Sequence, residues 1–202
     1  MLTSHFEVRA LRRLHVGPVD LSLDAGTCVS LTGRSGAGKS MLLRMIADLD
    51  PHEGDAWLDG QACSAMPAPL WRRKVTYIPA QSGWWDPMVA AHFPKATDFA
   101  ALLPRLGLPA QAADWPVSRL STGERQRLAL LRALHGANRV LLLDEPTSGL
   151  DPDSVAAVEA LLRERLAAGL TILLVTHDSD QAGRLATRRF HLQDGRLGAG
   201  IA

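Results

Sequence analysis

The stretch that decides the fold lies at residues 33–40 and reads Gly33, Arg34, Ser35, Gly36, Ala37, Gly38, Lys39, Ser40. It matches in full the pattern G-x-x-x-x-G-K-[ST], whose backbone N–H groups surround the phosphates of a nucleotide. An apolar run at residues 29–32 predicts a buried strand before it, and the apolar spacing after Ser40 predicts an amphipathic helix. Because the motif requires a strand, a loop and a helix in this order, we predict that these eight residues bind a nucleotide.

The chemistry of the loop gives two of its side chains separate roles. The glycines let the backbone approach a polyphosphate without a clash at Cβ, and the N-terminus of the following helix adds partial positive charge. Lys39 supplies a charge for the β- and γ-phosphates, and the Ser40 hydroxyl is placed to bind Mg²⁺. The alternative is a glycine-rich turn that fits the pattern without a ligand.

A second element of a phosphate site lies at residues 140–145, where four apolar residues precede Asp144 and Glu145. The apolar run predicts a strand buried on both faces of a parallel sheet, and ligands of such sheets bind at the carboxyl ends of the strands. We therefore predict that Asp144 holds Mg²⁺, directly or through water, and that Glu145 accepts a proton from the attacking water. The alternative is that Asp144 only caps the segment that follows.

A third motif lies at residues 120–127, which read LSTGERQR. Ser121 and Glu124 have the Ser-x-x-Glu spacing of a capping box, which predicts a helix that begins here and runs to Gly136. A well-capped helix is one interpretation; beside a phosphate loop, we favour a second anion-binding helix N-terminus. The motif resembles the signature motif of the ATP-binding cassette (ABC) ATPases.

Three further matches extend this resemblance. Gln81 resembles the family's Q-loop glutamine, residues 148–151 resemble its D-loop, and His177 resembles its switch histidine. The resemblance implies an α/β fold with the P-loop core of ABC ATPases: a mostly parallel sheet with helices, an N-terminal antiparallel β-subdomain and a short helical subdomain. We expect one nucleotide-binding domain over residues 1–202, with the helical subdomain at residues 82–120.

The resemblance also implies ATP and Mg²⁺ as ligands and ATP hydrolysis coupled to transport as the activity. The implied catalytic residues are Lys39, Gln81, Glu145 and His177, and the implied Mg²⁺ ligands are Ser40, Gln81 and Asp144. The implied nucleotide site further includes Ser121, Gly123 and Asp151, and Ser121 and Gly123 close over ATP held by a second copy of the chain. The implied partners are therefore a second copy, in an ATP-dependent head-to-tail dimer, and a separate transmembrane permease.

Two positions depart from the family pattern. Thr122 stands where the family usually has glycine, and a β-branched residue there predicts an altered helix start with binding retained. The aromatic residue that usually stacks on adenine is missing between Gly17 and Gly33, and the matching position falls near His15. His15 either stacks on adenine through its imidazole or lies in an exposed loop, and both interpretations stay open.

Within the family, residues 89–94 and 120–150 resemble the FetA/YbbL-type ATP-binding proteins, which are assigned to metal (iron) export. Metal-ion export is thus an implied transport function. The scattered histidines and the two cysteines, Cys28 and Cys63, have no metal-ligand spacing and add no support to it.

Other classes of nucleotide-binding protein fit the sequence less well. An ABC ATPase of DNA repair needs a long coiled coil after Gln81, where this chain has a short, proline-rich segment. A translation factor of the family carries two cassettes, and a small-molecule kinase need not carry residues 121–126 or His177. A regulatory nucleotide-binding module stays open if Thr122 and His15 prevent turnover.

Charge and hydropathy limit where the protein acts. The formal net charge of +1 argues against strong electrostatic recruitment to nucleic acid. No apolar stretch approaches the ~20 residues of a membrane span, and residues 1–4 lack the layout of a signal peptide. Two cysteines without metal-ligand spacing suit a reduced compartment. We expect a cytoplasmic protein, held at the inner face of the cell membrane through its permease.

Apolar periodicity predicts the other elements. We expect antiparallel strands over residues 6–23, a short edge strand at 54–60, and core parallel strands at 28–32, 75–78, 140–143 and 171–175. Helices are expected at 153–168 and, briefly, at 97–106 and 110–115, with a final hairpin at 190–197 that turns at Asp194 and Gly195.

Two adjacent tryptophans, Trp84 and Trp85, follow Gln81 in a loop. Neighbouring side chains point in different directions, so the two rings are not expected to enter one core together. Either both anchor a protein partner, or one caps the core of the helical subdomain and the other is exposed. The family resemblance places this region against the permease.

Overall fold

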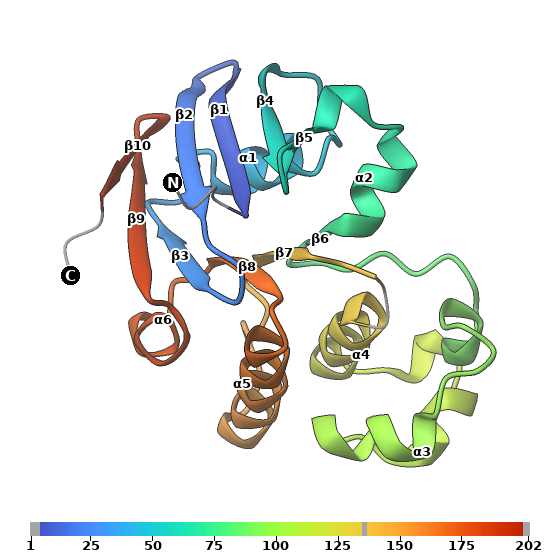
Figure 1. The fold of residues 1–202 in the computed structure, drawn as a ribbon. Helices are drawn as coiled ribbons and strands as arrows, with labels where there is room; N and C mark the ends of the chain where they lie inside the picture. Colours follow the sequence, from blue (N-terminus) through green and yellow to red (C-terminus); the bar gives the residue numbers. More distant parts are fainter. Residues whose placement is uncertain (1–4, 135–136, 200–202) are drawn as a thin grey trace.

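The computed structural model of the chain describes residues 5–134 and 137–199 (Figure 1). Its strands are β1 (Phe6–Arg13), β2 (Val16–Leu23), β3 (Cys28–Thr32), β4 (Glu53–Leu58), β5 (Gln61–Ala62), β6 (Val75–Ile78), β7 (Val140–Asp144), β8 (Thr171–Val175), β9 (Arg188–Gln193) and β10 (Arg196–Ala199). Its α-helices are α1 (Lys39–Ile46), α2 (Ala68–Lys74), α3 (Phe99–Leu102), α4 (Thr122–Leu134), α5 (Pro152–Ala167) and α6 (Ser179–Leu185). The predicted end of α4 at Gly136 lies outside the described residues.

The described strands form two sheets. An antiparallel sheet has the order β2-β1-β4-β5, and a larger sheet has the order β10-β9-β3-β8-β7-β6. In the larger sheet every pair of neighbours is parallel except β9 and β10, which form a hairpin. This arrangement confirms the predicted α/β fold with a mostly parallel core and an N-terminal antiparallel sheet.

Two strands lie where the sequence analysis did not place them. The strand predicted at the edge, β4, lies between β1 and β5, because the two-residue strand β5 pairs with its far side. The hairpin strand β9 also pairs in parallel with β3, so that Leu31 lies opposite Phe190. The C-terminal hairpin therefore extends the core sheet, and its turn at Asp194 and Gly195 is as predicted.

Strand β7 shows how the core is built. Leu142 packs in an apolar cluster with α1 and the antiparallel sheet, whereas Leu141 and Leu143 pack in a second cluster with α4 and α5. Successive side chains of a strand point to opposite faces, so a strand covered on both sides is apolar at every position. Helix α1 accordingly lies between the two sheets, and α5 and α6 cover the other face of the larger sheet (Figure 1).

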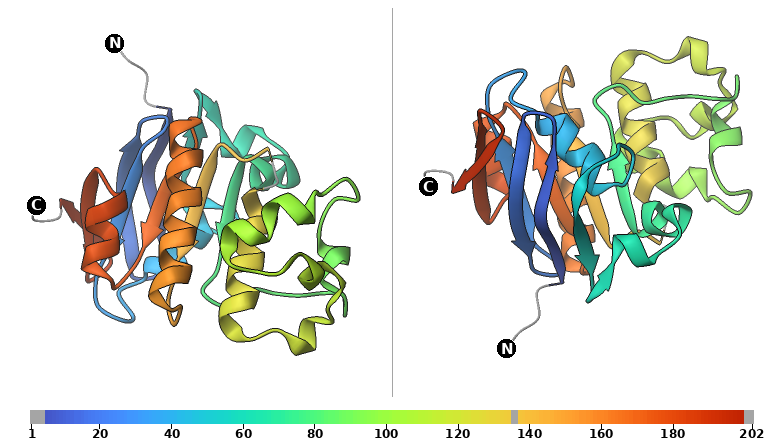
Figure 2. Two further views of the ribbon diagram at one scale, coloured as in Figure 1. Left: turned by 90° about the horizontal axis from the view of Figure 1, so that it is seen from below. Right: turned by 90° about the horizontal axis from the view of Figure 1, so that it is seen from above.

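The helical subdomain stands to one side of the sheets (Figure 2). Its helices are as brief as predicted: α3 has four residues, and four short 3₁₀ turns supply the rest, at Val89–His92, Pro104–Leu106, Ala110–Asp114 and Val117–Arg119. The prolines of this segment limit helix length because each lacks the backbone N–H that helix continuation needs. Buried Leu103 and Leu106 attach the subdomain to the second apolar cluster.

Parallel pairing brings the functional motifs together. The register sets Ile78 beside Leu143 and Asp144 beside Val175, so strands β6, β7 and β8 end at one edge of the sheet. The loop after β3 reaches the same edge, because Leu31 lies beside Val175. Residues that follow these strands, far apart in sequence, therefore share one site.

Candidate functional site

A cavity of about 420 Å³ opens at this edge of the larger sheet. Residues from the β1–β2 turn, the loop after β3, α1 and the ends of β6, β7 and β8 line it: His15, Ser35, Gly36, Gly38, Lys39, Ser40, Met41, Ala80, Asp144, Glu145 and His177. The structure thus gathers most residues predicted at the phosphates and the metal. Arg34 and Ala37 line a neighbouring cavity of about 420 Å³, which His15, Ser35 and Gly36 share.

The loop after β3 has the backbone conformation that the glycines were predicted to supply. Gly33, Gly36 and Gly38 have φ of 148°, 80° and 99°, a region that side chains with Cβ rarely adopt. A Cβ on Gly38 would lie 2.2 Å from Cγ2 of Val16, and one on Gly33 would lie 2.3 Å from the Leu192 carbonyl oxygen. Helix α1 begins directly after this loop, so its free N–H groups point toward the cavity.

The Lys39 side chain lies across the loop, where its positive charge is free to bind an anion. The side chain is buried, and its Nζ donates to the carbonyl oxygens of Gly33 at 2.7 Å and Arg34 at 3.1 Å. Among the described residues no carboxylate forms an ion pair with it. A cation that is held by carbonyls and lines an open cavity can exchange them for phosphate oxygens.

Asp144 is a buried carboxylate at the end of β7. The Tyr77 hydroxyl donates to its Oδ2 at 3.1 Å and fixes its orientation. Burial, with the nearby Asp144 charge, raises the pKa of Tyr77 and keeps it a donor. Ser40 and Asp144 line the same cavity and offer the hard oxygen donors that Mg²⁺ prefers.

No cluster of three or more His, Cys, Asp or Glu side chains within residues 5–134 and 137–199 could hold a metal by itself. Ser40 and Asp144 offer two oxygen donors to the same cavity, which fits Mg²⁺, because Mg²⁺ in nucleotide sites usually takes few protein oxygens and completes its shell with water or phosphate oxygens.

Glu145 is held in an unusual backbone conformation, with φ of 51°. Its N–H donates to the Val175 carbonyl at 2.9 Å, and its carbonyl accepts from the Gln126 side chain at 2.6 Å. Such strained conformations occur at sites where surrounding contacts over-determine them. Here the contacts turn the Glu145 side chain toward the cavity, next to Asp144.

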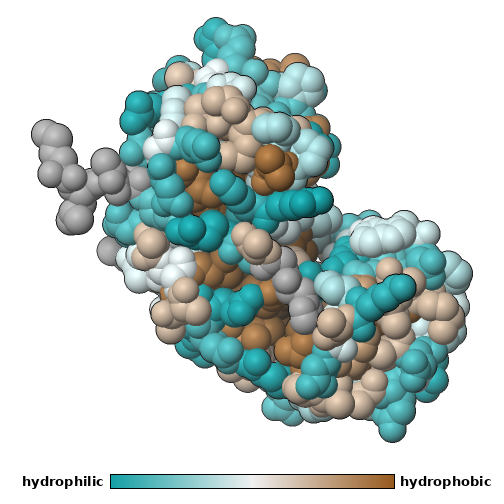
Figure 3. Space-filling model, turned by 45° about the vertical axis from the view of Figure 1, so that its right-hand side comes forward, coloured by the Kyte–Doolittle hydropathy of each residue, from teal (hydrophilic) through white to brown (hydrophobic). Residues whose placement is uncertain are grey.

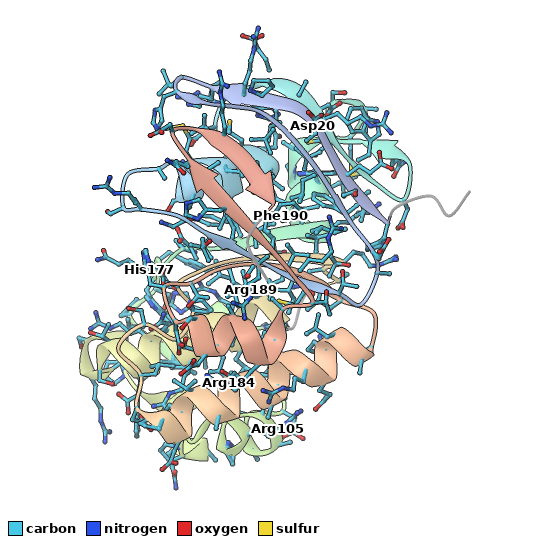
Figure 4. All side chains as sticks on the ribbon, turned by 90° about the vertical axis from the view of Figure 1, so that its left-hand side faces the viewer. Asp20, Arg105, His177, Arg184, Arg189 and Phe190 are labelled. Atoms are coloured by element: carbon cyan, nitrogen blue, oxygen red, sulfur yellow. The ribbon has the colours of Figure 1, made fainter. Side chains whose placement is uncertain are left out.

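His177 lies beside the Glu145 carboxylate. Its backbone N–H donates to Oε2 at 3.3 Å, and its Nε2 lies 3.4 Å from Oε1. Burial raises the pKa of Glu145 above its ordinary value of 4.5, whereas the N–H and charge of His177 lower it. In Figure 4 His177 lies at the rim of the molecule, between the sheets and the helices. A carboxylate and an imidazole thus face one cavity, which suits acid–base work on a bound group.

The residues of the signature motif lie outside the cavity. Ser121 and Glu124 form the predicted capping box: the Ser121 N–H donates to Glu124 at 2.8 Å, and the Glu124 N–H donates to Ser121 Oγ at 3.2 Å. Ser121 is exposed and Gly123 half-buried, and neither lines the cavity. Thr122 begins α4 with an ordinary negative φ, so it fits the helix start without strain.

Three other predicted residues are placed as follows. Asp151 is exposed and caps α5: its carboxylate accepts the Ser154 hydroxyl at 2.6 Å and the Ser154 N–H at 2.9 Å, and these hydrogen bonds lower its pKa. Gln81 is exposed and does not line the cavity, although its neighbour Ala80 does. His15 is exposed but lines both cavities, and a Cβ on Gly38 would lie 3.5 Å from its Nε2. The proposed roles of these residues stay predictions.

Two residues of the site were not predicted from the sequence. Tyr77 orients Asp144, and Gln126 holds Glu145, yet each lies on a different element from the group that it contacts. The sequence signal for Gln126 was a polar residue inside the predicted helix after Ser121.

No helix of the described ranges is long and apolar enough to cross a membrane.

Comparison with known proteins gives consistent matches. A family model described as ABC transporter matches residues 16–148. The chain is 38% identical over 190 residues to the aliphatic sulfonates import ATP-binding protein SsuB of Burkholderia pseudomallei (strain K96243), covering 92% of this chain and 57% of that protein. It is 38% identical over 197 residues to the macrolide export ATP-binding/permease protein MacB of Bordetella avium (strain 197N), covering 89% of this chain and 30% of that protein. The chain therefore spans less than two thirds of the length of each of these relatives.

Solved structures share the fold. A dimeric ATP-binding cassette in a post-hydrolysis state with ADP and Pi superposes with a TM-score of 0.82 at 24% identity, covering 98% of this chain and 99% of that one. A bacterial Atm1-family ABC exporter with ATP bound gives a TM-score of 0.81 at 24% identity, covering 96% of this chain and 38% of that one.

Proposed function

This chain belongs to the ABC transporter family, and we propose that it is an ATP-binding and ATP-hydrolysing subunit that drives a separate membrane permease. The observation that carries the proposal is one cavity lined by a loop lysine, a strand-end aspartate and a glutamate beside a histidine. Each of these groups suits one part of phosphoryl transfer to water.

Phosphate binding depends on the positive charge of Lys39 and on backbone N–H groups. The loop amides and the N-terminus of α1 receive the phosphate oxygens, and Lys39 leaves the carbonyls of Gly33 and Arg34 to pair with the β- and γ-phosphates. Ser40 and Asp144 would hold Mg²⁺, which neutralises charge on the phosphates when bound.

Glu145 is the proton acceptor. Its carboxylate orients the attacking water and accepts its proton, while His177, 3.4 Å away, contacts the γ-phosphate. Partial burial raises the Glu145 pKa, so the ionised carboxylate is a stronger base than an exposed one. Gln81 reports the presence of γ-phosphate to the helical subdomain.

A complete site takes two copies of the chain. Exposed Ser121 and half-buried Gly123 lie at the start of α4, outside their own cavity. In the proposed head-to-tail dimer they close over ATP held by a second copy, which gives two sites. The dimeric cassette of similar fold is consistent with this arrangement. ATP then joins the subunits, and hydrolysis separates them.

The permease places the protein on the inner face of the cell membrane, in the cytoplasm. The relatives include an import protein and an export protein, so the sequence matches favour neither direction. Metal-ion export, implied by the resemblance to FetA/YbbL-type proteins, is the specific transport function that we propose for testing. Metal uptake or release by membrane vesicles that hold the chain and its permease would decide it.

ATP hydrolysis by the purified chain tests the core of the proposal. Glu145→Gln keeps size and hydrogen bonding but removes the base, so turnover should fall ~10²–10⁴-fold while ATP binding persists. Lys39→Ala should instead lose ATP binding, because no side chain replaces its charge at the phosphates. Phosphate release and equilibrium binding of labelled ATP separate the two effects. Near-normal turnover by Glu145→Gln would show that the carboxylate has another role.

A further inference from the structure

The loop that carries His177, between β8 and α6, is attached at two points to the segment that follows β7. Before the loop, the Val175 carbonyl accepts the Glu145 N–H at 2.9 Å. After the loop, the Gln181 side chain on α6 donates from Nε2 to the Thr147 hydroxyl at 2.7 Å. His177 therefore lies between two hydrogen bonds that both end beside the Glu145 carboxylate or two residues after it.

The two attachments differ in kind. The bond between Glu145 and Val175 joins backbone groups where β7 and β8 pair, so any sequence that forms this sheet can make it. The bond between Gln181 and Thr147 joins two side chains that are 34 residues apart in sequence, so it depends on the identity of both residues. One substitution at either position removes it and leaves the backbone hydrogen bonds in place.

Gln181 is a polar residue in the interior. Polar side chains cover much of the exterior face in Figure 3 (teal), where water satisfies them, but Gln181 is 0% exposed and Thr147 only 8%. Within residues 5–134 and 137–199 the Gln181 Oε1 has no partner, so the bond to Thr147 is the only hydrogen bond that this side chain makes. An apolar pair of the same shape can be as stable, because it leaves no acceptor unpaired. Stability alone therefore does not explain why a glutamine stands here.

Helix α6 is a firm support for Gln181. Asp178 caps its first turn by accepting the N–H groups of Asp180 at 2.8 Å and Gln181 at 3.0 Å. In its last turn Arg184 donates to the buried Glu159 carboxylate of α5 at 2.7–3.0 Å, which holds α6 beside α5 (Figure 4). Because α6 is fixed at both ends, the Gln181 amide is held in place and locates the segment that it contacts.

We propose that Gln181 is a positioning residue for ATP hydrolysis, because its hydrogen bond to Thr147 sets the distance between His177 and the Glu145 carboxylate. This inference rests on the proposed function, in which these two groups act on the γ-phosphate and the attacking water. The His177 Nε2 lies 3.4 Å from Glu145 Oε1, and the His177 N–H donates to Oε2 at 3.3 Å. Both distances are long for hydrogen bonds, so a small shift of the loop would break them. Neither Gln181 nor Thr147 lines the cavity, so neither is placed to bind the nucleotide.

Two single substitutions and their combination test the proposal. Gln181→Leu removes the amide and Thr147→Val removes the hydroxyl, and each new side chain is close to the old one in size. Each should lower kcat roughly tenfold, as expected for one buried hydrogen bond, and leave the affinity for labelled ATP within about twofold. Because both remove the same bond, the double variant should also be roughly tenfold slower, whereas two independent effects would multiply to roughly a hundredfold.

Thermal unfolding separates positioning from stability. Either single variant leaves a buried polar group unpaired and should unfold at a lower temperature, whereas the double variant has an apolar pair and should recover most of that loss. Positioning predicts that kcat stays low in the double variant although its stability returns. The proposal would be overturned by a kcat that recovers with stability, by single variants with wild-type kcat, or by losses that multiply.

Thr171 provides the matched control for Thr147. It is also buried, and its hydroxyl donates to the Asp24 carbonyl at 3.1 Å, but it lies at the start of β8, whereas the cavity lies at the end of that strand. Thr171→Val should lower the unfolding temperature and leave kcat unchanged. If Gln181→Leu fails to fold, Thr147→Val still removes the same bond, and its comparison with Thr171→Val decides the question.

Hydrogen exchange tests the same link without nucleotide. Measured by mass spectrometry on the free chain, Thr147→Val should speed amide exchange at residues 176–180, and Gln181→Leu should speed it at residues 145–150. Thr171→Val should change neither segment. Unchanged exchange in both variants would show that this bond does not hold the loop. A wild-type chain without ATPase activity would instead refute the proposed function, and the exchange measurement would still decide whether Gln181 positions His177.

Discussion

Gln126 provides the sharpest test of how the site is organised. Gln126 is 7% exposed, and its side-chain amide donates to the Glu145 carbonyl at 2.6 Å, which helps to hold Glu145 at a φ of 51°. Leucine has nearly the same volume but no donor. Gln126→Leu therefore leaves a buried carbonyl without its partner and releases one restraint on the strained residue.

The expected loss follows from this single contact. An unsatisfied buried acceptor costs about 1–3 kcal/mol. If the whole loss falls on the alignment of Glu145 in the transition state, kcat falls roughly 5- to 150-fold. ATP affinity should change little, because in the proposed site the loop and Lys39, which line the cavity, make the phosphate contacts. The midpoint temperature of thermal unfolding should fall by about 2–4 °C for each kcal/mol of stability lost, as for other domains of this size.

The assay measures kcat, KM and thermal unfolding together. Asn138→Ala is the matched control, because the Asn138 amide also donates to a carbonyl, that of Ala133 at 2.8 Å, but lies away from the cavity. It should lower stability and leave kcat unchanged. A folded Gln126→Leu protein with wild-type kcat would refute the view that this hydrogen bond positions the catalytic carboxylate.

Two further predictions concern assembly and pH. With hydrolysis blocked by Glu145→Gln, saturating ATP and Mg²⁺ should shift the chain from monomer to dimer in sedimentation. Adding Ser121→Arg should abolish the shift, because it places bulk and charge at the phosphates bound by the partner. A protein that stays monomeric under saturating ATP would contradict the dimer. Because burial raises the Glu145 pKa, the base is lost as pH falls through that raised value, so the acid limb of the kcat/KM profile should lie above 4.5. An acid limb at or below 4.5 would argue against Glu145 as the base.

The sequence alone predicted the fold class and most of the candidate phosphate site. The loop at residues 33–40 is a local structure, because three glycines, a lysine and a serine at fixed spacing specify it without distant contacts. The strands at 28–32, 75–78, 140–143 and 171–175 were also predictable, because burial on both faces makes such strands mostly apolar along their length. Parallel strands then place Asp144, Glu145 and His177 at one edge, as the structure confirms.

Only the tertiary structure decided which groups support these residues and what lies next to them. Tyr77 and Gln126 act through hydrogen bonds to Asp144 and Glu145 across 67 and 19 residues of sequence, and no local pattern encodes such pairs. The position of β4 inside its sheet depends on its pairing with the two-residue β5, which is too short to leave a periodic pattern. The sequence suggested that Trp84 and Trp85 would diverge, but only packing around His92 and Arg132 fixed one ring inward and the other outward. Side-chain contacts between distant elements depend on the whole packed fold, and local sequence patterns do not specify them.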